Sequence, residues 1–289
     1  MVEEKDDYSD ALKKLSPELQ EKIKTLANNR SLPAWPEQTR GVPNLCLRSA
    51  LFGVIQRGRR KAVKKEPIAS VSGLCIHYTG WRLDQGDFDV LAHAIHLASH
   101  QSTGQFVQFT AKGFLKGIGR SFGKSGREWL KDSLRRLTAS AVEIRFEMPC
   151  GYGTETFSYT GSLLDEFYYT ENDQSYCLKF NSKLAKLFDA GWTQLQWQQR
   201  LHLKADLAKW LHGFYASHRA PYPMKVTTLQ QLCGSGCGRL SDYRGKLRFA
   251  LEELVRAEIL ASWSIDPDDK VHVQKRESRT PITCFDGGA

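Results

Sequence analysis

The sequence predicts an α+β fold in which one order of helices and strands occurs twice. The first observation is a match of the chain with itself at an offset of 117 positions, without a gap, in which Thr110 coincides with Thr227 and Gly119 with Gly236. The second is that cationic and apolar positions coincide in the same frame. These pairs are Arg127 with Arg244, Lys131 with Arg248, Leu115 with Leu232, Leu130 with Leu247, Leu134 with Leu251, Leu137 with Leu254 and Val142 with Ile259. Leucines alone match by chance, but the threonine, glycine and cationic pairs favour a true repeat.

The repeated pattern is a short helix, a turn, a longer basic helix and an apolar strand. This order is typical of the winged helix-turn-helix, a module that places its second helix in a DNA major groove. We therefore expect two tandem winged-helix (winged helix-turn-helix) domains, related by an internal repeat, that read successive stretches of one duplex.

The N-terminal region, residues 1–43, is predicted to hold an exposed helix followed by a mobile linker. Ser16 and Pro17 are a typical start signal within the helix expected over residues 10–29. Residues Ser31–Pro43 contain three prolines, which favour a linker.

The first winged-helix domain is predicted over residues 44–190. Thr110 is expected to cap a helix over 111–118, and a capping box from Ser125 to Glu128 is expected to start the long basic helix. The other expected elements are a short helix from Asn44, a strand over 68–78, a helix over 87–100 capped by Asp87, a strand over 106–109, a hairpin of strands 142–146 and 156–159 as the wing, and a strand pair with a short helix over 163–188.

The second winged-helix domain is predicted over residues 191–276 and repeats that order. Its expected elements are a helix over 204–218, a strand over 224–226, a helix over 227–232, a long helix over 241–258 and a wing of strands 259–265 and 271–273. Residues 277–289 are polar and are expected to form a flexible tail.

The composition disfavours a membrane-inserted or secreted protein, and its charge does not separate nucleic acid from an anionic membrane as the partner. The formal net charge of +9 predicts a polyanionic partner. No apolar run approaches the roughly 18 residues of a membrane-spanning helix, and the acidic N-terminus lacks a signal-peptide pattern, so we expect a cytoplasmic protein. The seven cysteines are scattered and odd in number, which predicts no disulfide framework, and Cys233 and Cys237 lack the second ligand pair of a zinc finger.

The candidate DNA-binding residues lie on and beside the two long helices. Arg127 and Lys131 are predicted to reach guanine edges in the major groove. Lys112, Lys116 and Arg120 are predicted to hold phosphates, which position a protein without specifying sequence. The remaining candidates are Lys124, Ser125 and Arg135 near the first long helix, Arg145 on the first wing, and Arg239, Ser241, Arg244 and Arg248 at the second long helix. The alternative is a solvated charged face, and for the basic run from Arg57 to Lys65 a solvated linker is the favoured interpretation.

No set of residues predicts an enzyme, a cofactor or a metal site. Gly123-Lys124-Ser125 resembles the end of a phosphate-binding loop, but the first glycine is absent and a helix precedes it. His93, His96 and His100 share one helix face without a nearby carboxylate cluster, and we expect an exposed polar face rather than a metal site.

Several strings resemble the TrfA family of plasmid replication initiators. They are Gly41–Asn44 with Leu47–Phe52, Tyr78–Gly80, Leu83–Gln85, Phe114–Lys116, Arg127–Leu130, Trp210–His218 and Pro221–Met224, within a likeness that spans roughly residues 35–265. The resemblance implies tandem winged helices that bind direct repeats (iterons) at a plasmid origin in a bacterial host. It also implies opening of an adjacent AT-rich region, recruitment of host DnaB helicase with DnaA assisting, and a monomer–dimer balance that limits copy number.

Two further questions remain open from the sequence. Family members bind the sliding clamp through a Gln-Leu-x-Leu-Phe-like peptide; here Leu51-Phe52 ends a similar string, but Arg48 stands where glutamine is expected. A tandem winged-helix transcriptional repressor is the alternative function, distinguished by whether the target is a set of direct repeats or a single operator.

Overall fold

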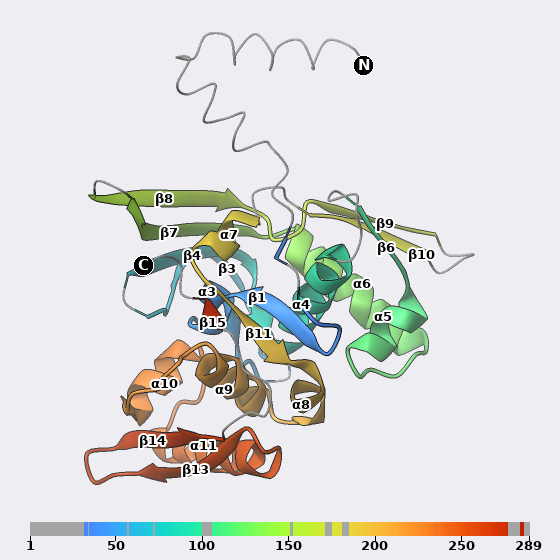
Figure 1. The fold of residues 1–289 in the computed structure, drawn as a ribbon. Coiled ribbons are helices and arrows are strands. Elements are labelled where there is room, and N and C mark those ends of the chain that lie inside the picture. Colours follow the sequence, from blue (N-terminus) through green and yellow to red (C-terminus); the bar gives the residue numbers. More distant parts are fainter. Residues whose placement is uncertain are drawn as a thin grey trace.

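The computed structural model describes residues 32–33, 35–56, 58–71, 73–99, 106–150, 153–170, 175–180, 185–276 and 284–285. The described residues form two hydrophobic cores. The first is built mainly from side chains between Trp35 and Trp197, and the second from side chains between Leu203 and Val271. We call the parts around them the first unit and the second unit; the second lies below the first in Figure 1. The predicted helix over residues 10–29 lies outside the described residues.

The second unit is a three-helix cluster closed by a small antiparallel sheet. Its helices are α9 (Asp206–Ala216), α10 (Val226–Leu232) and α11 (Leu240–Arg256). Its strands β12 (Met224–Lys225), β13 (Leu260–Ile265) and β14 (Lys270–Lys275) pair in the order β12-β14-β13. The leucines of the long helix lie on its inner face, because Leu247, Leu251 and Leu254 recur at helical spacing, and all three are fully buried.

The first unit contains the same order of elements, with two additions. Helix α4 (Gln85–Ser99) precedes strand β6 (Phe106–Thr110), helix α5 (Ala111–Gly117) and helix α6 (Lys124–Thr138). The hairpin of β9 (Glu166–Thr170) and β10 (Ser175–Lys179) then pairs with β6 in the order β6-β10-β9. This sheet matches β12-β14-β13 of the second unit element by element.

The first addition is a four-stranded antiparallel sheet. Strands β3 (Ala62–Ile68), β4 (Leu74–Trp81), β7 (Ala141–Cys150) and β8 (Gly153–Gly161) pair in that order. The hairpin β7–β8 was predicted to be the first wing, and that prediction is wrong. It follows α6 directly in sequence, but it pairs with β4 and extends away from the β6-β10-β9 sheet (Figure 1). The hairpin in the wing position is β9–β10.

The second addition is a sheet formed by chain segments distant in sequence. Strand β1 (Thr39–Pro43) pairs with β11 (Trp192–Gln196), and β15 (Cys284–Phe285) pairs with the other edge of β11. The linker prediction is therefore wrong over Thr39–Pro43, where every residue is buried, and the tail prediction is wrong over Cys284–Phe285. The prolines at 33, 36 and 43 flank or end the strand, so they mark its boundaries rather than a flexible stretch.

Short helices and loops complete the first unit. Helix α3 covers one turn, Asn44–Leu47, and the Ser49 hydroxyl donates to the Leu45 carbonyl at its end. The chain then enters strand β2 (Phe52–Gly53), which pairs in parallel with β5 (Leu83–Asp84). Helix α7 covers Lys186–Asp189, and α8 covers Trp197–His202. Since β11 and Trp197 belong to the first core, the division between the two cores falls near Leu203 rather than at the predicted boundary of 190 and 191.

The two repeated segments share their element order but not one constant offset. In the long helices the buried leucines match at 117, as predicted. In the preceding helices the buried residues Ala111 and Phe114 correspond to Val226 and Leu229, an offset of 115. The glycine that follows each short helix with a positive φ is Gly119 in the first unit and Gly234 in the second, not Gly236. The coincidence of Gly119 with Gly236 was thus a chance match.

The expected helix caps are corrected at two sites. Thr110 caps α5 as predicted, since its Oγ1 accepts from the Gly113 amide at 3.1 Å. Helix α6 instead begins one residue before Ser125, at Lys124, and Gly123 caps it without a side-chain bond, so the predicted capping box is not formed. At α4 the cap is Asp84, whose Oδ1 accepts from the amides of Gly86 and Asp87, because Asp87 itself is buried inside the helix.

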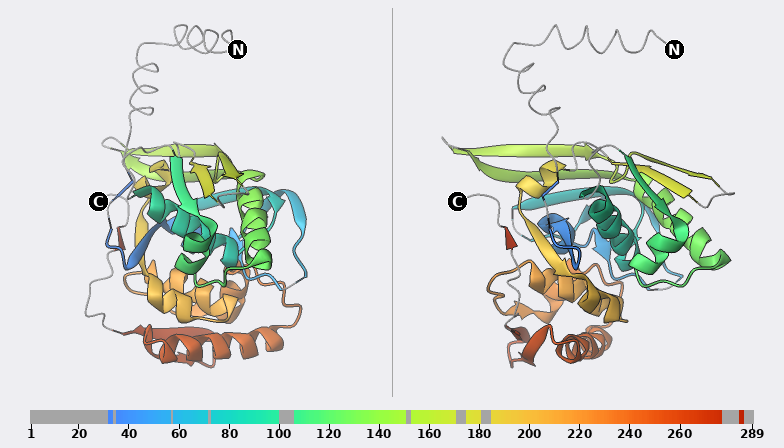
Figure 2. Two further views of the ribbon diagram at one scale, coloured as in Figure 1. Left: turned by 90° about the vertical axis from the view of Figure 1, so that its right-hand side faces the viewer. Right: turned by 45° about the vertical axis from the view of Figure 1, so that its right-hand side comes forward.

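A buried ionic junction joins the two units. Arg200 of α8 donates from Nε to Asp89 of α4 at 2.6 Å and from Nη1 to the Lys209 carbonyl of α9 at 2.8 Å. Lys209 Nζ also donates to Asp89, at 2.6 Å. Beside this junction the indole of Trp210 donates to the Ser49 carbonyl at 3.1 Å. The helix α9 of the second unit is therefore fixed to α4 and α8 of the first, and the views of Figure 2 show the two units packed directly against each other.

Among the described residues, no helix combines the length and the apolar character needed to cross a membrane.

Candidate nucleic-acid interface

The predicted phosphate-binding residues of the first unit are exposed around the turn between α5 and α6. Lys112 and Lys116 lie on the outer face of α5, because the inner face presents Ala111, Phe114 and Leu115 to the core. Arg120, Lys124, Ser125 and Arg135 are exposed as well, on the turn and on α6. The structure thus gathers these six side chains on two consecutive helices and their connection.

Two of these cations are held by neighbouring side chains. The guanidinium of Arg120 stacks 3.5 Å from the centre of the Trp129 ring, which fixes it beside α6. Arg135 pairs with Asp132 at 2.9 Å, and both side chains are more than half exposed. An exposed pair of this kind is weak, so Arg135 is available to a phosphate.

The predicted base-reading residues Arg127 and Lys131 are half-buried and lie toward aromatic side chains. Lys131 Nζ is 4.4 Å from the centre of the Tyr169 ring on β9 and 3.3 Å from the Glu128 carboxylate. The Arg127 guanidinium is 5.6 Å from the centre of the Phe122 ring. Both rings are exposed, and neither was predicted from the sequence as part of the site. The sequence did contain one signal for Tyr169, which is the Tyr168-Tyr169 pair in a predicted strand that follows the basic helix.

In the second unit the two candidate arginines of the long helix, Arg244 and Arg248, have different surroundings. Arg244 makes two hydrogen bonds to Asp269 in the β13–β14 turn, Nε to Oδ1 at 2.9 Å and Nη2 to Oδ2 at 2.8 Å, and these bonds lower the pKa of Asp269. Arg239, Ser241 and Arg248 are exposed. Arg244 therefore ties the long helix to its wing, and Arg248 is the better placed of the two to read bases.

This difference predicts unequal effects of two arginine substitutions. If Arg248 reads a base, Arg248→Ala is expected to weaken specific binding by about 1–3 kcal/mol and to relax preference at one base position, the effect of losing a bidentate contact to a guanine. The matched variant Arg244→Ala is expected to change base preference less, since its guanidinium is occupied by Asp269. Dissociation constants measured for a panel of single-base variants of the target check this; equal relaxation by both variants would contradict it.

Arg145 lies on β7, opposite Cys75 and Ser158, and is exposed. It belongs to the four-stranded sheet and not to the β9–β10 wing, so its predicted role in a wing contact loses its structural basis. In the second wing, His272 pairs with Asp266 at 2.7 Å, and Lys275 donates to the His218 carbonyl at 2.9 Å.

His93 and His96 of α4 are not part of an exposed polar face as the sequence predicts, and His100 lies outside the described residues. His93 and His96 are buried, and His96 Nδ1 accepts from the Trp35 indole at 3.0 Å. Burial, with the nearby charge of Arg40, lowers the pKa of His93 to about 3. Trp197, Gly117 and Phe114 pack around His93, which makes it a core residue. Within the described part of the chain no group of three or more His, Cys, Asp or Glu side chains is arranged to hold a metal ion.

Comparisons with known proteins bear on the family and the fold. The TrfA protein family matches residues 9–276. The plasmid replication initiator protein TrfA of Escherichia coli is 27% identical over 247 residues, which cover 83% of this chain and 63% of that protein. The chain thus spans less than two thirds of the length of this relative. A crystal structure of domain 2 and domain 3 of RctB superposes with a TM-score of 0.56 at 12% identity, covering 82% of this chain and 99% of that one, which shows a shared fold. Because the family match covers most of the sequence, this chain belongs to the TrfA family.

Proposed function

We propose that this protein is a plasmid replication initiator that binds direct repeats (iterons) at a plasmid origin through two tandem winged-helix modules. The observation that carries the proposal is the repeated arrangement β6-α5-α6-β9-β10 and β12-α10-α11-β13-β14, with exposed cations on the second helix of each copy. A winged helix presents that helix to the major groove. The likeness to a plasmid replication initiator supports the biological role.

In this proposal α6 and α11 read successive major grooves, and exposed cations around the α5–α6 turn hold the backbone. Binding of several copies to adjacent repeats supplies the free energy that bends and unstacks a flexible AT-rich segment nearby. The open segment then receives host DnaB helicase, with DnaA assisting, and a monomer–dimer balance limits copy number. We place the protein in the bacterial cytoplasm and assign it no catalytic step.

The clamp-binding peptide is not part of the proposal. Leu51 and Phe52, which end the nearest similar string, are 1% and 0% exposed and pack in the first core. A sliding clamp would need these side chains outside the fold.

Footprinting on the plasmid origin tests the proposal. We expect protection of direct repeats beside an AT-rich segment, with two successive major grooves covered in each repeat. Protection of a single promoter operator would favour the tandem winged-helix transcriptional repressor instead. Supercoiled origin DNA incubated with the protein and Mg²⁺ is expected to stay un-nicked, and nicking would overturn the assignment of no enzymatic activity.

The phosphate role of α5 gives a prediction that concerns salt dependence. Lys116→Ala is expected to weaken binding to all duplex sequences alike, because a phosphate contact carries no sequence information. The slope of log K against log salt concentration is negative, and its magnitude should decrease by about 0.9 for the one contact removed. Titrations of a specific and an unrelated duplex across a range of salt concentrations check this, and a loss confined to the specific duplex would contradict a phosphate contact.

A further inference from the structure

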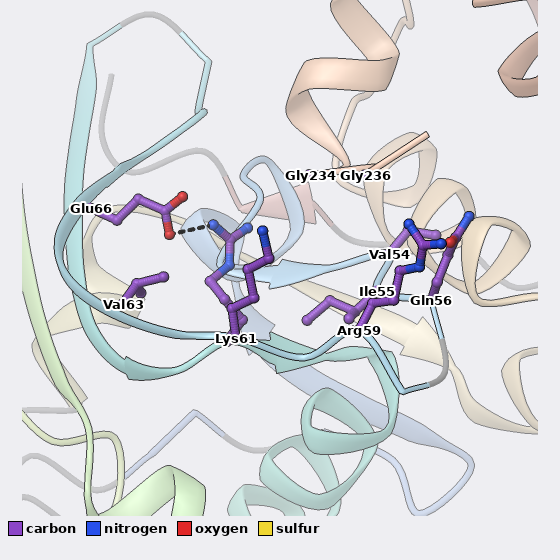
Figure 3. A pocket seen from close by; sticks show the side chains of 10 residues that line it. Val54, Ile55, Gln56, Arg59, Lys61, Val63, Glu66, Gly234 and Gly236 are labelled. Atoms are coloured by element: carbon purple, nitrogen blue, oxygen red, sulfur yellow. Dashed lines mark hydrogen bonds and ion pairs between the residues drawn. The ribbon is translucent and has the colours of Figure 1, made fainter. Parts of the chain in front are cut away.

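A pocket of about 200 Å³ lies where the first unit meets the turn between α10 and α11 of the second (Figure 3). Its cationic lining is Arg59, Lys61 and Arg82, and its glycines are Gly234 and Gly236. We infer that this pocket binds one phosphate of the DNA backbone, next to the groove that α11 reads. The inference rests on the proposed function, because it assumes that both modules hold one duplex. The pocket would add a third point of contact with that duplex, between the two modules.

The basic run that leads into β3 is divided by the fold into two kinds of side chain. Arg60 is turned inward, where it pairs with Asp84 and, at 2.7 Å, with the buried Asp87. Arg59 and Lys61 are exposed at the pocket, and no carboxylate in the described part of the chain pairs with either of them. Within the run predicted to be a solvated linker, the structural cation Arg60 thus has one unneutralised cation on either side, Arg59 and Lys61.

The pocket has a net positive lining. Glu66 is the acidic residue of the lining, and it pairs with Arg82 at 2.7 Å (Figure 3). Three cations and one carboxylate leave a formal charge of +2. A doubly cationic pocket open to solvent attracts an anion, and the guanidinium and ammonium groups match the oxygens of a phosphate.

The turn supplies backbone to the same pocket. Gly234 has a φ of +62°, and a Cβ there would lie 3.1 Å from Arg82 Nη2 and 3.0 Å from Ala50 Cβ, so the glycine lets the guanidinium approach the turn. Gly236 is exposed with open space around its Cα, and its amide has no hydrogen-bond partner among the described residues. A free amide beside two cations is a common element of phosphate sites.

The position of the pocket favours a backbone phosphate over a free anion. The turn at Gly236 continues through Arg239 and Ser241 into the first turn of α11. A phosphate held here flanks the base pairs that the start of α11 would contact. Both units form the pocket, so the contact also requires their observed arrangement.

The variant Arg59→Ala/Lys61→Ala of the full chain tests the inference. The probes are a duplex obtained by binding-site selection with the unaltered protein and an unrelated duplex of equal length. We expect affinity to fall about tenfold near 0.1 M salt on both duplexes, and the salt slope to fall by about 0.9, with base preference unchanged. Arg59→Lys/Lys61→Arg should retain the affinity. The control Lys186→Ala removes a cation from α7, which does not line the pocket, and should leave the slope unchanged.

Neutral methylphosphonates placed one at a time along the selected duplex locate the contact. At one position the neutral group should weaken DNA binding by the unaltered protein but not by the double alanine variant. An unchanged salt slope in the variant, or a slope reduced equally by the control, overturns the inference while leaving the proposed function standing. Binding of inorganic phosphate to the unaltered protein and to the double alanine variant is measured as well. If the variant loses phosphate binding but keeps its DNA affinity, the pocket binds a free anion and the inference is overturned. Failure of the unaltered protein to select any sequence would instead defeat the proposed function.

Discussion

Arg200→Ala is expected to lower the free energy of unfolding by about 3–5 kcal/mol. The Arg200 side chain is 1% exposed and that of Asp89 is 4% exposed, so the substitution leaves a buried carboxylate with one partner fewer. It also removes the bonds to the Gln85 side chain at 2.9 Å and to the Lys209 carbonyl, and the stacking of the guanidinium 4.4 Å from the centre of the Phe88 ring. Urea denaturation followed by circular dichroism measures the change.

Lys209→Ala is the matched control, because Lys209 pairs with the same carboxylate but its side chain is 16% exposed. We expect it to cost less than Arg200→Ala, since water reaches the remaining charge. Since Arg200 joins the two cores, Arg200→Ala is also expected to separate their unfolding into two steps. A loss below about 1 kcal/mol in a single step would show that the junction contributes little.

Acid is expected to destabilise the protein by about 2 kcal/mol for each of two buried histidines between pH 7 and pH 5. Burial lowers the pKa of His93 and of His212 to about 3, and among the described residues the Nδ1 atom of each has no hydrogen-bond partner. In the unfolded chain the pKa of histidine is about 6.5. Their neutral forms therefore add stability that is fully present above about pH 6.5 and is lost as the pH falls toward 3.

Urea denaturation at pH 7 and pH 5 checks this expectation. The variant His93→Gln/His212→Gln should lose most of the difference between the two pH values, whatever its stability at pH 7. His202→Gln removes an exposed histidine and should retain the difference. Equal stability of the unaltered protein at pH 7 and pH 5 would show that these two side chains do not titrate as described.

The sequence predicts the second unit better than the first, and the reason is physical. In the second unit the long helix α11 leads directly into the hairpin β13–β14, so periodicity and turn residues predict this part of the chain well. In the first unit β6 pairs with β10 across an intervening hairpin, and β1 pairs with β11 across some 150 residues. Pairing between distant strands leaves little trace in a single sequence, which is why the wing was assigned to β7–β8 and β1 to a linker.

In the candidate site, too, the sequence predicts what depends on local periodicity and misses what depends on contacts between distant elements. Exposure of Lys112, Lys116 and Arg248 follows from their place opposite the leucine face of an amphipathic helix, which the sequence displays. The pairing of Arg244 with Asp269, and of Arg136 with Asp87 at 2.7 Å, depends on tertiary contacts between elements. A stripe of arginines in a sequence therefore does not tell which members are structural.

The fixed attachment of α9 to α4 and α8 has a consequence for the duplex. If α6 and α11 belong to one inflexible body, their angular offset is a property of the protein. B-form DNA turns once in about 10–10.5 base pairs. Any disagreement between that repeat and the built-in offset cannot be absorbed at a hinge in the protein, so it is taken up as overwinding or underwinding of the base pairs between the two contacts. The buried Arg200 would then determine how much torsion each bound copy imposes on the plasmid.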